Sequence, residues 1–307
     1  MDHPLIRQDP SAKDLRKRVV DLLQSGYSVP RSGNIIFVCG GNDAAHMRIL
    51  FKDYCAVSAK SYQIFFPEFA MTDYFSNVAI EPFDIADFEV MVGELSHAIV
   101  LFPEAPGSFA ETGYFALAPQ MAKKTILVMD ANRQHKDSFI SMGPASKIGI
   151  ASTFRPIVQV DYRNPDFSII KDRIDRHHPG HTRKAFALSP YSAMSKFDLF
   201  GLIQKIVHLL QFARIDDIMY IMTALFSNRM KRKEIKQIAS VLVGAEYMKQ
   251  FGVYGYYALE SSKKVLLEAR EGFVAKEKEI IIEIREDISK SDRELQEMLK
   301  GPSSVPV

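Results

Sequence analysis

An apolar run that ends in a Pro/Gly turn is the feature that most limits how this chain can fold. Residues 99–102 are apolar, Pro103, Pro106 and Gly107 follow them, and the next segment has a helical composition. Such a run followed by Pro and Gly predicts a strand, a turn and then a helix. In an open α/β sheet, ligands bind at the carboxyl ends of the strands, where these turns lie. The amides at the start of the helix suit an anionic or polar sugar-phosphate group.

Five strand-like segments alternate with stretches long enough for helices. They cover residues 34–39, 62–66, 97–102, 125–129 and 157–160. This alternation is typical of an α/β fold with a parallel, doubly wound sheet. Residues 12–24 have apolar residues at helical spacing and predict a helix before the first strand. We therefore expect an α/β domain over residues 1–180.

Glu111 follows the turn inside the predicted helix, and a carboxylate there has two explanations. Ser108 as N-cap and Glu111 three residues later would form a capping box, which stabilises the start of a helix. Alternatively, Glu111 attacks the anomeric carbon of a sugar and forms a covalent glycosyl intermediate. The local sequence leaves both explanations open.

Residues 35–128 resemble the nucleoside 2-deoxyribosyltransferase family. The resemblance rests on the strand and Gly turn at 35–41, on Glu89, and on the sequence G-S-F-A-E-T-G at 107–113. It implies a sheet of the deoxyribosyltransferase type with Glu111 as the nucleophile and Glu89 as a second catalytic residue. The candidate substrate-binding residues of the two motifs are Gly40, Gly41, Gly107 and Ser108.

Glu89 stands where that family has an Asp, and Ala105 stands where it has a second Asp, which argues against ordinary deoxyribosyl transfer. If Glu89 points toward Glu111, the two carboxylates push their pKa values apart. Glu111 would then stay ionised, while Glu89 holds a proton or positions a sugar hydroxyl. The alternative is that Glu89 belongs to the solvated face of an acidic helix.

A closer resemblance is to the ribosyltransferase/DNA-binding effectors of bacterial type II retrons. It rests on F-P-E-x-P-G-S-F-x-E-x-G at 102–113, on C-G-G at 39–41, and on a helical second half that matches more loosely. The resemblance implies a toxic antiphage effector that acts with a reverse transcriptase and its branched RNA–DNA product. It also implies NAD as the substrate, cleaved to nicotinamide and ADP-ribose without a further cofactor, and a loop at 138–144 that closes over the site.

Other polar residues near the predicted turns are candidate substrate contacts. Asp43 and His46 follow the Gly turn, and Arg48 offers a cation for a phosphate. Glu68 and Glu104 each follow a strand in an F-P-E turn. The alternatives are that Asn42 or Asp43 caps a helix, that His46 lies on the exposed face of that helix, and that both glutamates are solvated turn carboxylates.

The second half has the element order of a winged helix-turn-helix, which we expect over residues 190–307. Helices are predicted at 196–212 and 215–226, a basic third helix at 229–238, and two wing strands at 247–248 and 253–259. Such modules place the third helix against nucleic acid and the wing against its backbone. The candidate contacts are Lys231, Arg232, Lys233, Lys236, Lys249 and Tyr254. The alternative is a protein-interaction module, because the net charge of +2 is small.

The sequence also predicts the structure of two segments outside these elements, residues 161–181 and 261–300. Residues 161–181 read as a linker, whose three histidines at 177–181 form a polar loop rather than a metal site. Residues 261–300 predict one long helix. Its apolar run at 280–284 is too apolar to stay solvated and would pack on another copy of the chain or on another domain, and we expect a homo-oligomer.

Composition excludes several classes of protein. No apolar run has transmembrane length, residues 1–4 lack the features of a signal peptide, and the 2 cysteines make no disulfide framework. We therefore expect a cytoplasmic protein without a membrane partner, a metal or a cofactor. Two alternatives to NAD cleavage stay open: a nucleoside or nucleotide N-glycosidase or deoxyribosyltransferase, and a non-catalytic regulator that senses a nucleotide and binds DNA.

Overall fold

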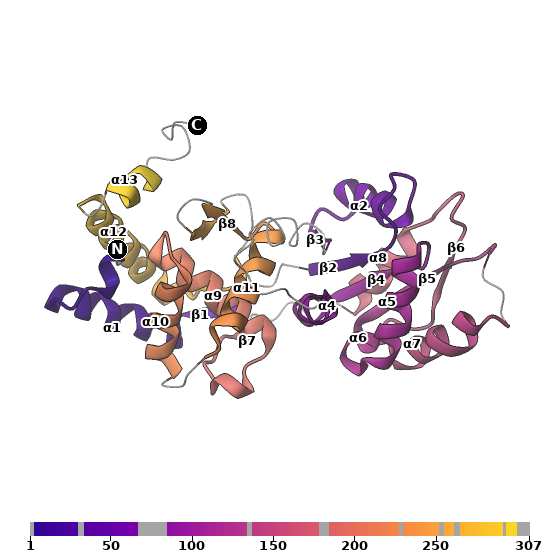
Figure 1. Cartoon of the computed structure of the whole chain (residues 1–307), viewed down its shortest axis with the longest axis horizontal. Helices are drawn as coiled ribbons and strands as arrows, with labels where there is room; N and C mark the ends of the chain where they lie inside the picture. Colours follow the sequence, from indigo (N-terminus) through magenta and orange to yellow (C-terminus); the bar gives the residue numbers. More distant parts are fainter. Residues whose placement is uncertain are drawn as a thin grey trace. The chain divides into compact units, whose positions relative to one another are not determined.

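The computed structural model divides the chain into two compact units (Figure 1). The sheet unit is Ser32–His181, and the helical unit combines Met1–Arg31 with Thr182–Val307. The structure describes residues 3–29, 34–66, 85–133, 137–177, 184–226, 230–251, 255–260, 265–290 and 293–299. No helix in these ranges is both long and apolar enough to span a bilayer.

Helix α1 (Pro10–Ser25) belongs to the helical unit, whereas the sequence led us to expect it in the first domain. Helix α1 joins the helical unit because the apolar stripe on its surface is buried there. Leu15, Val19 and Leu22 are fully buried, and the helix packs against three helices formed by the second half of the chain. The first domain therefore starts with its first sheet strand, and not with the helix before it.

The sheet unit contains a five-stranded parallel sheet, as the alternation of strands and helices predicted. The strand order is β3 (Tyr62–Phe65), β2 (Asn34–Cys39), β4 (Ala98–Leu101), β5 (Thr125–Asp130) and β6 (Val158–Val160). In the register, Ile36 of β2 lies beside Ile64 of β3 and Ala98 of β4. Because β3 and β4 lie on opposite sides of β2, the winding of the chain reverses between β2 and β4. Sheets of this kind bind ligands at that point, outside the carboxyl ends of the strands.

Helices cover both faces of this sheet (Figure 1). One face carries α2 (Met47–Ser58) and α8 (Ser168–Arg176), and the other carries α4 (Ile85–Leu95), α5 (Pro106–Leu117), α6 (Pro119–Lys124) and α7 (Ser146–Ala151). A π-helical turn, η2 (Ser141–Ala145), precedes α7. Helix α8 lies where we expected a linker, and that prediction was wrong because Ile170 and Ile174 form an apolar face that the sheet buries.

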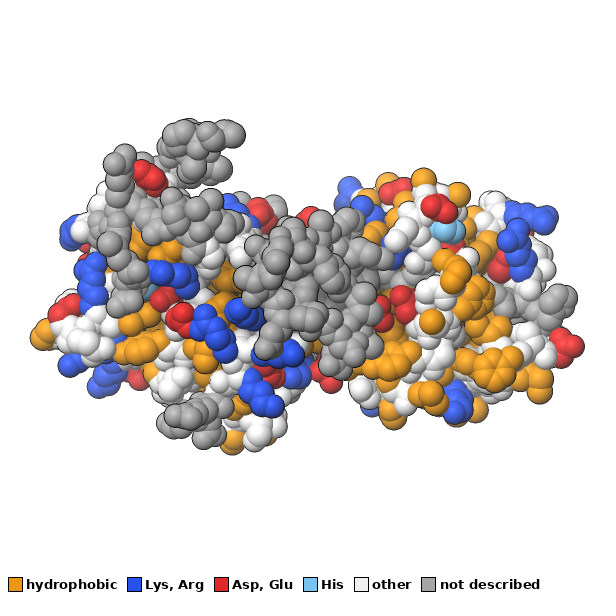
Figure 2. Space-filling view, in the orientation of Figure 1, with side chains coloured by type: hydrophobic (Ala, Val, Ile, Leu, Met, Phe, Trp, Pro, Cys, Tyr) orange, Lys and Arg blue, Asp and Glu red, His pale blue; other side chains and the backbone are white. Residues whose placement is uncertain are grey.

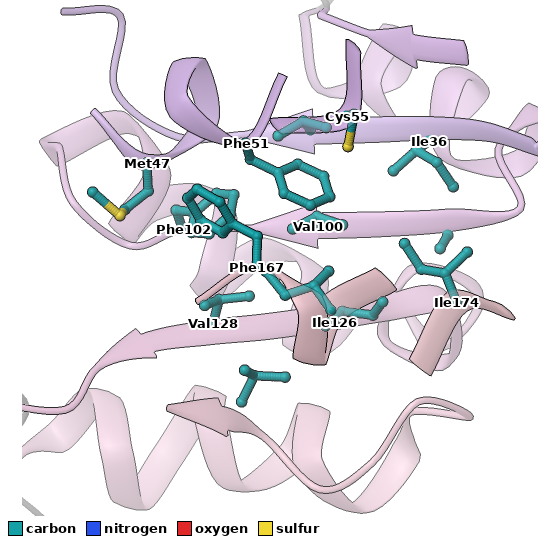
Figure 3. Packing of buried hydrophobic residues seen from close by; sticks show 14 of the residues in the cluster. Ile36, Met47, Phe51, Cys55, Val100, Phe102, Ile126, Val128, Phe167 and Ile174 are labelled. Atoms are coloured by element: carbon teal, nitrogen blue, oxygen red, sulfur yellow. The ribbon is translucent and has the colours of Figure 1, made fainter. Parts of the chain in front are cut away.

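Aromatic rings form the centre of the core between the sheet, α2 and α8 (Figure 3). The ring of Phe51 lies 5.9 Å from that of Phe102 and 5.5 Å from that of Phe167, and these residues pack on Val100 and Val128. Tilted and edge-on ring pairs at this separation add to the gain from burial. This core holds the carboxyl ends of β2 and β4 and the first turn of α2 in place.

Both cysteines, Cys39 and Cys55, are buried. Burial raises the pKa of the Cys55 thiol to about 12, so that thiol stays protonated at neutral pH.

The helical unit contains the three helices and the hairpin that the sequence predicted. They are α9 (Lys196–Leu210), α10 (Ile215–Phe226), α11 (Arg232–Gly244) and the antiparallel strands β8 (Met248–Phe251) and β9 (Tyr256–Leu259). A small antiparallel sheet joins β10 (Glu268–Ala269), β1 (Tyr27–Val29) and β7 (Lys184–Ala185). It links residues before the sheet unit to residues after it.

The last described segment is not one long helix. After β10 come the single turn η4 (Glu271–Phe273), α12 (Val274–Ser289) and α13 (Arg293–Leu299). Ile280, Ile284 and Ile288 of α12 are buried inside the chain, where the helix packs against α1 and α9. The run therefore packs on other helices of the same chain through Ile280 and Ile284, whereas Ile282 is 58% exposed.

A buried histidine makes the helical unit sensitive to acid. His3 precedes the turn η1 (Pro4–Ile6), accepts a hydrogen bond from the Leu5 amide at 3.2 Å, and donates one to the Leu210 carbonyl at 3.0 Å. Burial lowers the pKa of His3 from 6.5 to about 4. Below pH 6.5 the unfolded chain therefore binds a proton that the folded chain does not, and stability falls with the pH.

We expect the unit to lose roughly 2 kcal/mol of unfolding free energy from this group between pH 7 and pH 5. Urea denaturation followed by circular dichroism at both pH values measures the loss. His3→Gln, which cannot titrate, should show a smaller difference between the two. An equal difference in the wild type and in this variant would contradict the assignment.

Candidate functional site

A carboxylate ties the turns after β2 and β4 together. The side chain of Glu104, which follows β4, accepts a hydrogen bond from the amide of Gly41 through Oε1 at 3.0 Å and one from the amide of Met47 through Oε2 at 2.8 Å. Met47 is the first residue of α2, so Glu104 satisfies an amide that the helix itself leaves unbonded. Glu104 is therefore not a solvated turn carboxylate, and the structure gives it a positioning role.

The Gly turn after β2 has no room for side chains. A Cβ at Gly40 would lie 2.7 Å from Oε1 of Glu104, and one at Gly41 would lie 2.3 Å from Nδ1 of His46. His46 is half-buried, and its Nδ1 accepts a hydrogen bond from the amide of Asp43 at 2.8 Å. The neutral imidazole in this arrangement has its proton on Nε2, which faces away from that bond.

The alternative explanation, that Asn42 or Asp43 caps helix α2, was wrong. The N-cap residue is His46, whose side chain makes no capping hydrogen bond, and Glu104 bonds the first helical amide instead. Asp43 is exposed at the rim of the Gly turn.

Ser108 and Glu111 do not form the capping box that the spacing S-x-x-E suggested. Helix α5 begins at Pro106, so Ser108 is its third residue and Glu111 lies in its second turn. The Ser108 hydroxyl accepts hydrogen bonds from the amides of Glu104 and Ala105, each at 3.0 Å, and donates one to the Ala105 carbonyl at 2.9 Å. Ser108 is buried and shapes the turn, while helix capping does not account for Glu111.

Glu111 lies at the border between the buried and the exposed face of α5. The helix packs on the sheet through Thr112 and Phe115, and the Phe115 ring is 6.4 Å from that of Phe37 on β2. Glu111 is half-buried, with Oε2 shielded from solvent. Gly107 lies one turn earlier on the same side of the helix, where an added Cβ would meet no atom of the described residues within 4 Å. Gly107 therefore places no side chain beside Glu111.

Glu89 is half-buried and lies in the second turn of α4. The crossover helices of a parallel sheet run antiparallel to the strands, so α4 and α5 both begin near its carboxyl edge. Both pack against α6, and both contact β2. The fold thus places the two predicted catalytic glutamates in the second turns of two helices that share one layer.

Two further polar residues at this edge were missed by the sequence reasoning. Asp130 is the last residue of β5 and is buried, and Tyr162 donates a hydrogen bond to the Val128 carbonyl at 2.7 Å. Burial, together with the nearby carboxylates of Glu104 and Asp130, raises the pKa of Tyr162, so the phenol stays protonated. The sequence signal for Asp130 is an acid directly after an apolar strand.

The other predicted contacts of the sheet unit are distributed as follows. Arg48 is buried, and its guanidinium carbon lies 5.0 Å from the centre of the Phe66 ring, so it is not a surface cation. Glu68 lies outside the described residues. Within the described part of the chain, no three His, Cys, Asp or Glu residues are arranged to hold a metal ion. His178 and His181 lie outside that part.

The basic start of α11 is present and exposed. Lys231, Arg232 and Lys233 are exposed, and Lys236 is half-buried. Arg232 forms a two-pronged ion pair with Asp216 of α10, so part of its charge is compensated inside the unit. Figure 2 shows Lys and Arg side chains on the visible face of this unit, with carboxylates among them.

Glu234 on the same helix holds a different group of residues. It accepts hydrogen bonds from Lys196 at 2.7 Å and from Tyr191 at 2.6 Å. Burial alone would raise the pKa of Glu234, but these hydrogen bonds keep that pKa below its usual value. In the predicted wing, Lys249 is half-buried, with Nζ 5.6 Å from the centre of the Phe251 ring, and Tyr254 lies outside the described residues.

Comparison with known proteins identifies relatives of this chain. Residues 44–250 match the family of the STM3845 retron effector protein. Over 119 residues the chain is 34% identical to "Retron Ec86 putative ribosyltransferase/DNA-binding protein" of Escherichia coli. This alignment covers 37% of this chain and 38% of that protein. Over 123 residues it is 26% identical to "Retron Ec73 putative ribosyltransferase/DNA-binding protein" of the same species, with 38% and 39% covered.

The chain thus aligns with about two fifths of the length of each relative. The match to the family, in contrast, extends over well more than half of this chain and includes Glu104, Glu111 and the basic helix α11. The chain belongs to the STM3845 retron effector family.

Proposed function

We propose that this retron effector cleaves the N-glycosidic bond of NAD, with Glu111 as the nucleophile. The observation that carries the proposal is the position of Glu111. It lies in the second turn of α5, beside the point where the winding of the sheet reverses, and it has no capping role there. The names of the two relatives, which include ribosyltransferase, agree with chemistry at a ribosyl carbon.

The proposed reaction has two steps. A carboxylate oxygen of Glu111 attacks C1′ of the nicotinamide ribose, and the bond from C1′ to the pyridinium nitrogen breaks. The electron pair of that bond neutralises the nitrogen, so nicotinamide leaves without needing a proton. Water then attacks C1′, the ester to Glu111 breaks, and the proton of the water passes to solvent as ADP-ribose leaves.

The surrounding residues have supporting parts in this proposal. Gly107 places no side chain beside Glu111, and Glu89 positions a ribose hydroxyl. Glu104 holds the Gly turn to α2 and occupies amides that would otherwise attract a phosphate. The substrate pyrophosphate would therefore bind away from the start of α2.

The test is the identity of the products. The full chain is incubated with NAD, with ribonucleosides and with deoxynucleosides, alone and together with the reverse transcriptase and RNA–DNA product of its retron, and the products are measured by mass spectrometry. Nicotinamide and ADP-ribose in equal amounts support the proposal. Release of a base from nucleosides only would favour a nucleoside N-glycosidase, and transfer to an added base would favour a deoxyribosyltransferase. No turnover, together with DNA binding that depends on a nucleotide, would favour the regulator.

The helical unit serves, in this proposal, as a winged-helix module that binds the branched RNA–DNA product of the retron. Helices α9, α10 and α11 followed by the hairpin β8–β9 have the element order of that module. The exposed cations at the start of α11 are placed for phosphate contacts, which provide most of the affinity for nucleic acid. The names of the two relatives also include DNA-binding.

Replacing both Lys231 and Lys233 with Ala is expected to weaken nucleic-acid binding at every sequence and to lower the salt slope of log Kd by about two, because two phosphate contacts are lost. Fluorescence anisotropy at several salt concentrations measures this. The matched control is Lys13→Ala with Lys17→Ala, two exposed lysines on α1. Equal effects of the two double variants would contradict a specific role for α11.

A further inference from the structure

The outer side of the sheet unit carries an extensive exposed apolar surface. It is formed by α5, η2 with the residues before it, and α7, which pack against one another. Six large side chains on it are exposed by 39% to 85%: Phe109, Tyr114, Leu117, Phe139, Met142 and Ile150. Figure 2 shows hydrophobic side chains gathered over these helices. We call these six residues the α5–α7 patch.

The patch has the area of a stable interface. A large side chain presents about 200 Å² when fully exposed, so these six together expose roughly 700 Å² of mainly apolar surface. The largest apolar patch of a typical monomer is about 300–600 Å², whereas each partner in a stable protein complex buries about 800 Å².

The charges around the patch indicate what covers it. The described residues of α5, of 137–145 and of α7 include three charged residues, which are the half-buried Glu111 and the exposed Asp137 and Lys147. A nucleic acid would need several cations there, which these elements lack. In a twofold dimer the same surface is present on both subunits, and a nearly uncharged surface can face itself without repulsion between like charges.

We infer that the α5–α7 patch is the interface through which two copies of this chain form a symmetric dimer. The inference does not depend on the reaction proposed above. The outer face of α5, the helix that carries Glu111, is covered by the partner copy in this arrangement. Helix α12 is not part of this contact, and its Ile280, Ile284 and Ile288 are already buried within the chain.

Sedimentation velocity of the full chain over a range of micromolar concentrations tests the inference. The wild type is expected to dimerise, and Ile150→Glu to raise the dissociation constant at least about 100-fold, because a buried charge appears twice in a symmetric interface. Val57→Glu is the matched control. Both residues are next to last in their helices, α7 and α2, and they are 72% and 76% exposed.

A measurement without substitutions keeps the test independent of variant folding. Amide hydrogen exchange of the wild type should slow in α5 and α7, and not in α2, as the concentration rises through the dimerisation range. A wild type that stays monomeric would overturn the inference, as would a dimer that Ile150→Glu and Val57→Glu weaken equally. Protection confined to the helical unit would also overturn it.

Discussion

Replacing Glu111 with Gln is expected to slow NAD cleavage by the full chain at least about a thousandfold, because an amide of the same size cannot serve as the nucleophile. The fold should stay intact, since Glu111 closes no capping box and Ser108 shapes the turn without it. The rate is measured from nicotinamide release, and a thermal melt shows whether the variant is folded.

The control for this variant is Glu94→Gln, which removes a half-buried carboxylate from α4 in the same helical layer. It should retain most of the activity. Rapid acid quenching followed by peptide mass spectrometry should find an ADP-ribosyl adduct on the peptide with Glu111. Activity of Glu111→Gln above a tenth of the wild type, or an adduct on another residue, would rule out Glu111 as the nucleophile.

Replacing Glu277 with Ala is expected to reduce the unfolding free energy of the helical unit by about 3–5 kcal/mol, because it leaves a buried ammonium group without its partner. The Lys205 side chain is only 3% exposed, and its Nζ lies 3.0 Å from Oε1 of Glu277 and 4.8 Å from the centre of the Tyr27 ring. The Tyr27 hydroxyl also donates a hydrogen bond to Oε1 of Glu277, at 3.1 Å. Burial lowers the pKa of Lys205, and the Glu277 carboxylate counteracts this shift.

A second substitution distinguishes a lost ion pair from lost packing. Lys205→Met in the background of Glu277→Ala removes the uncompensated charge and should restore at least half of the lost stability. Urea denaturation of the wild type, both single variants and the double variant completes the cycle. Additive losses, or a loss below about 1 kcal/mol for Glu277→Ala, would show that the pair contributes no more than a surface ion pair does.

The regular elements of this protein could be predicted from local patterns. The five sheet strands are short and mainly apolar segments, and the helices α9 and α10 have apolar residues at helical spacing. Gly40 and Gly41 at a strand end also indicated the edge where the site lies. These features depend on neighbouring residues, and a sequence displays such neighbours directly.

The roles of the site residues could not be predicted in the same way. S-x-x-E matched a capping box, but Ser108 bonds the turn before the helix, and Glu104 caps a helix that begins 57 residues earlier in the chain. Likewise, the apolar faces of α1 and α12 did not indicate which part of the chain would cover them. A sequence pattern shows that a side chain needs a partner, and only the tertiary structure decides which distant residue provides it, since burial and hydrogen bonding depend on proximity in space.

The sequence by itself determined the α/β sheet, the order of the helices and hairpin that follow it, and the position of Glu111 after the strand–turn segment. The tertiary structure alone decided that α1 joins the helical unit, that Glu104 closes the Gly turn, and that capping does not account for Glu111. One physical reason separates the features that the sequence determined from those that the tertiary structure decided. Backbone conformation responds to local side chains, whereas the partner of a buried polar or apolar group is set by the packing of the whole domain.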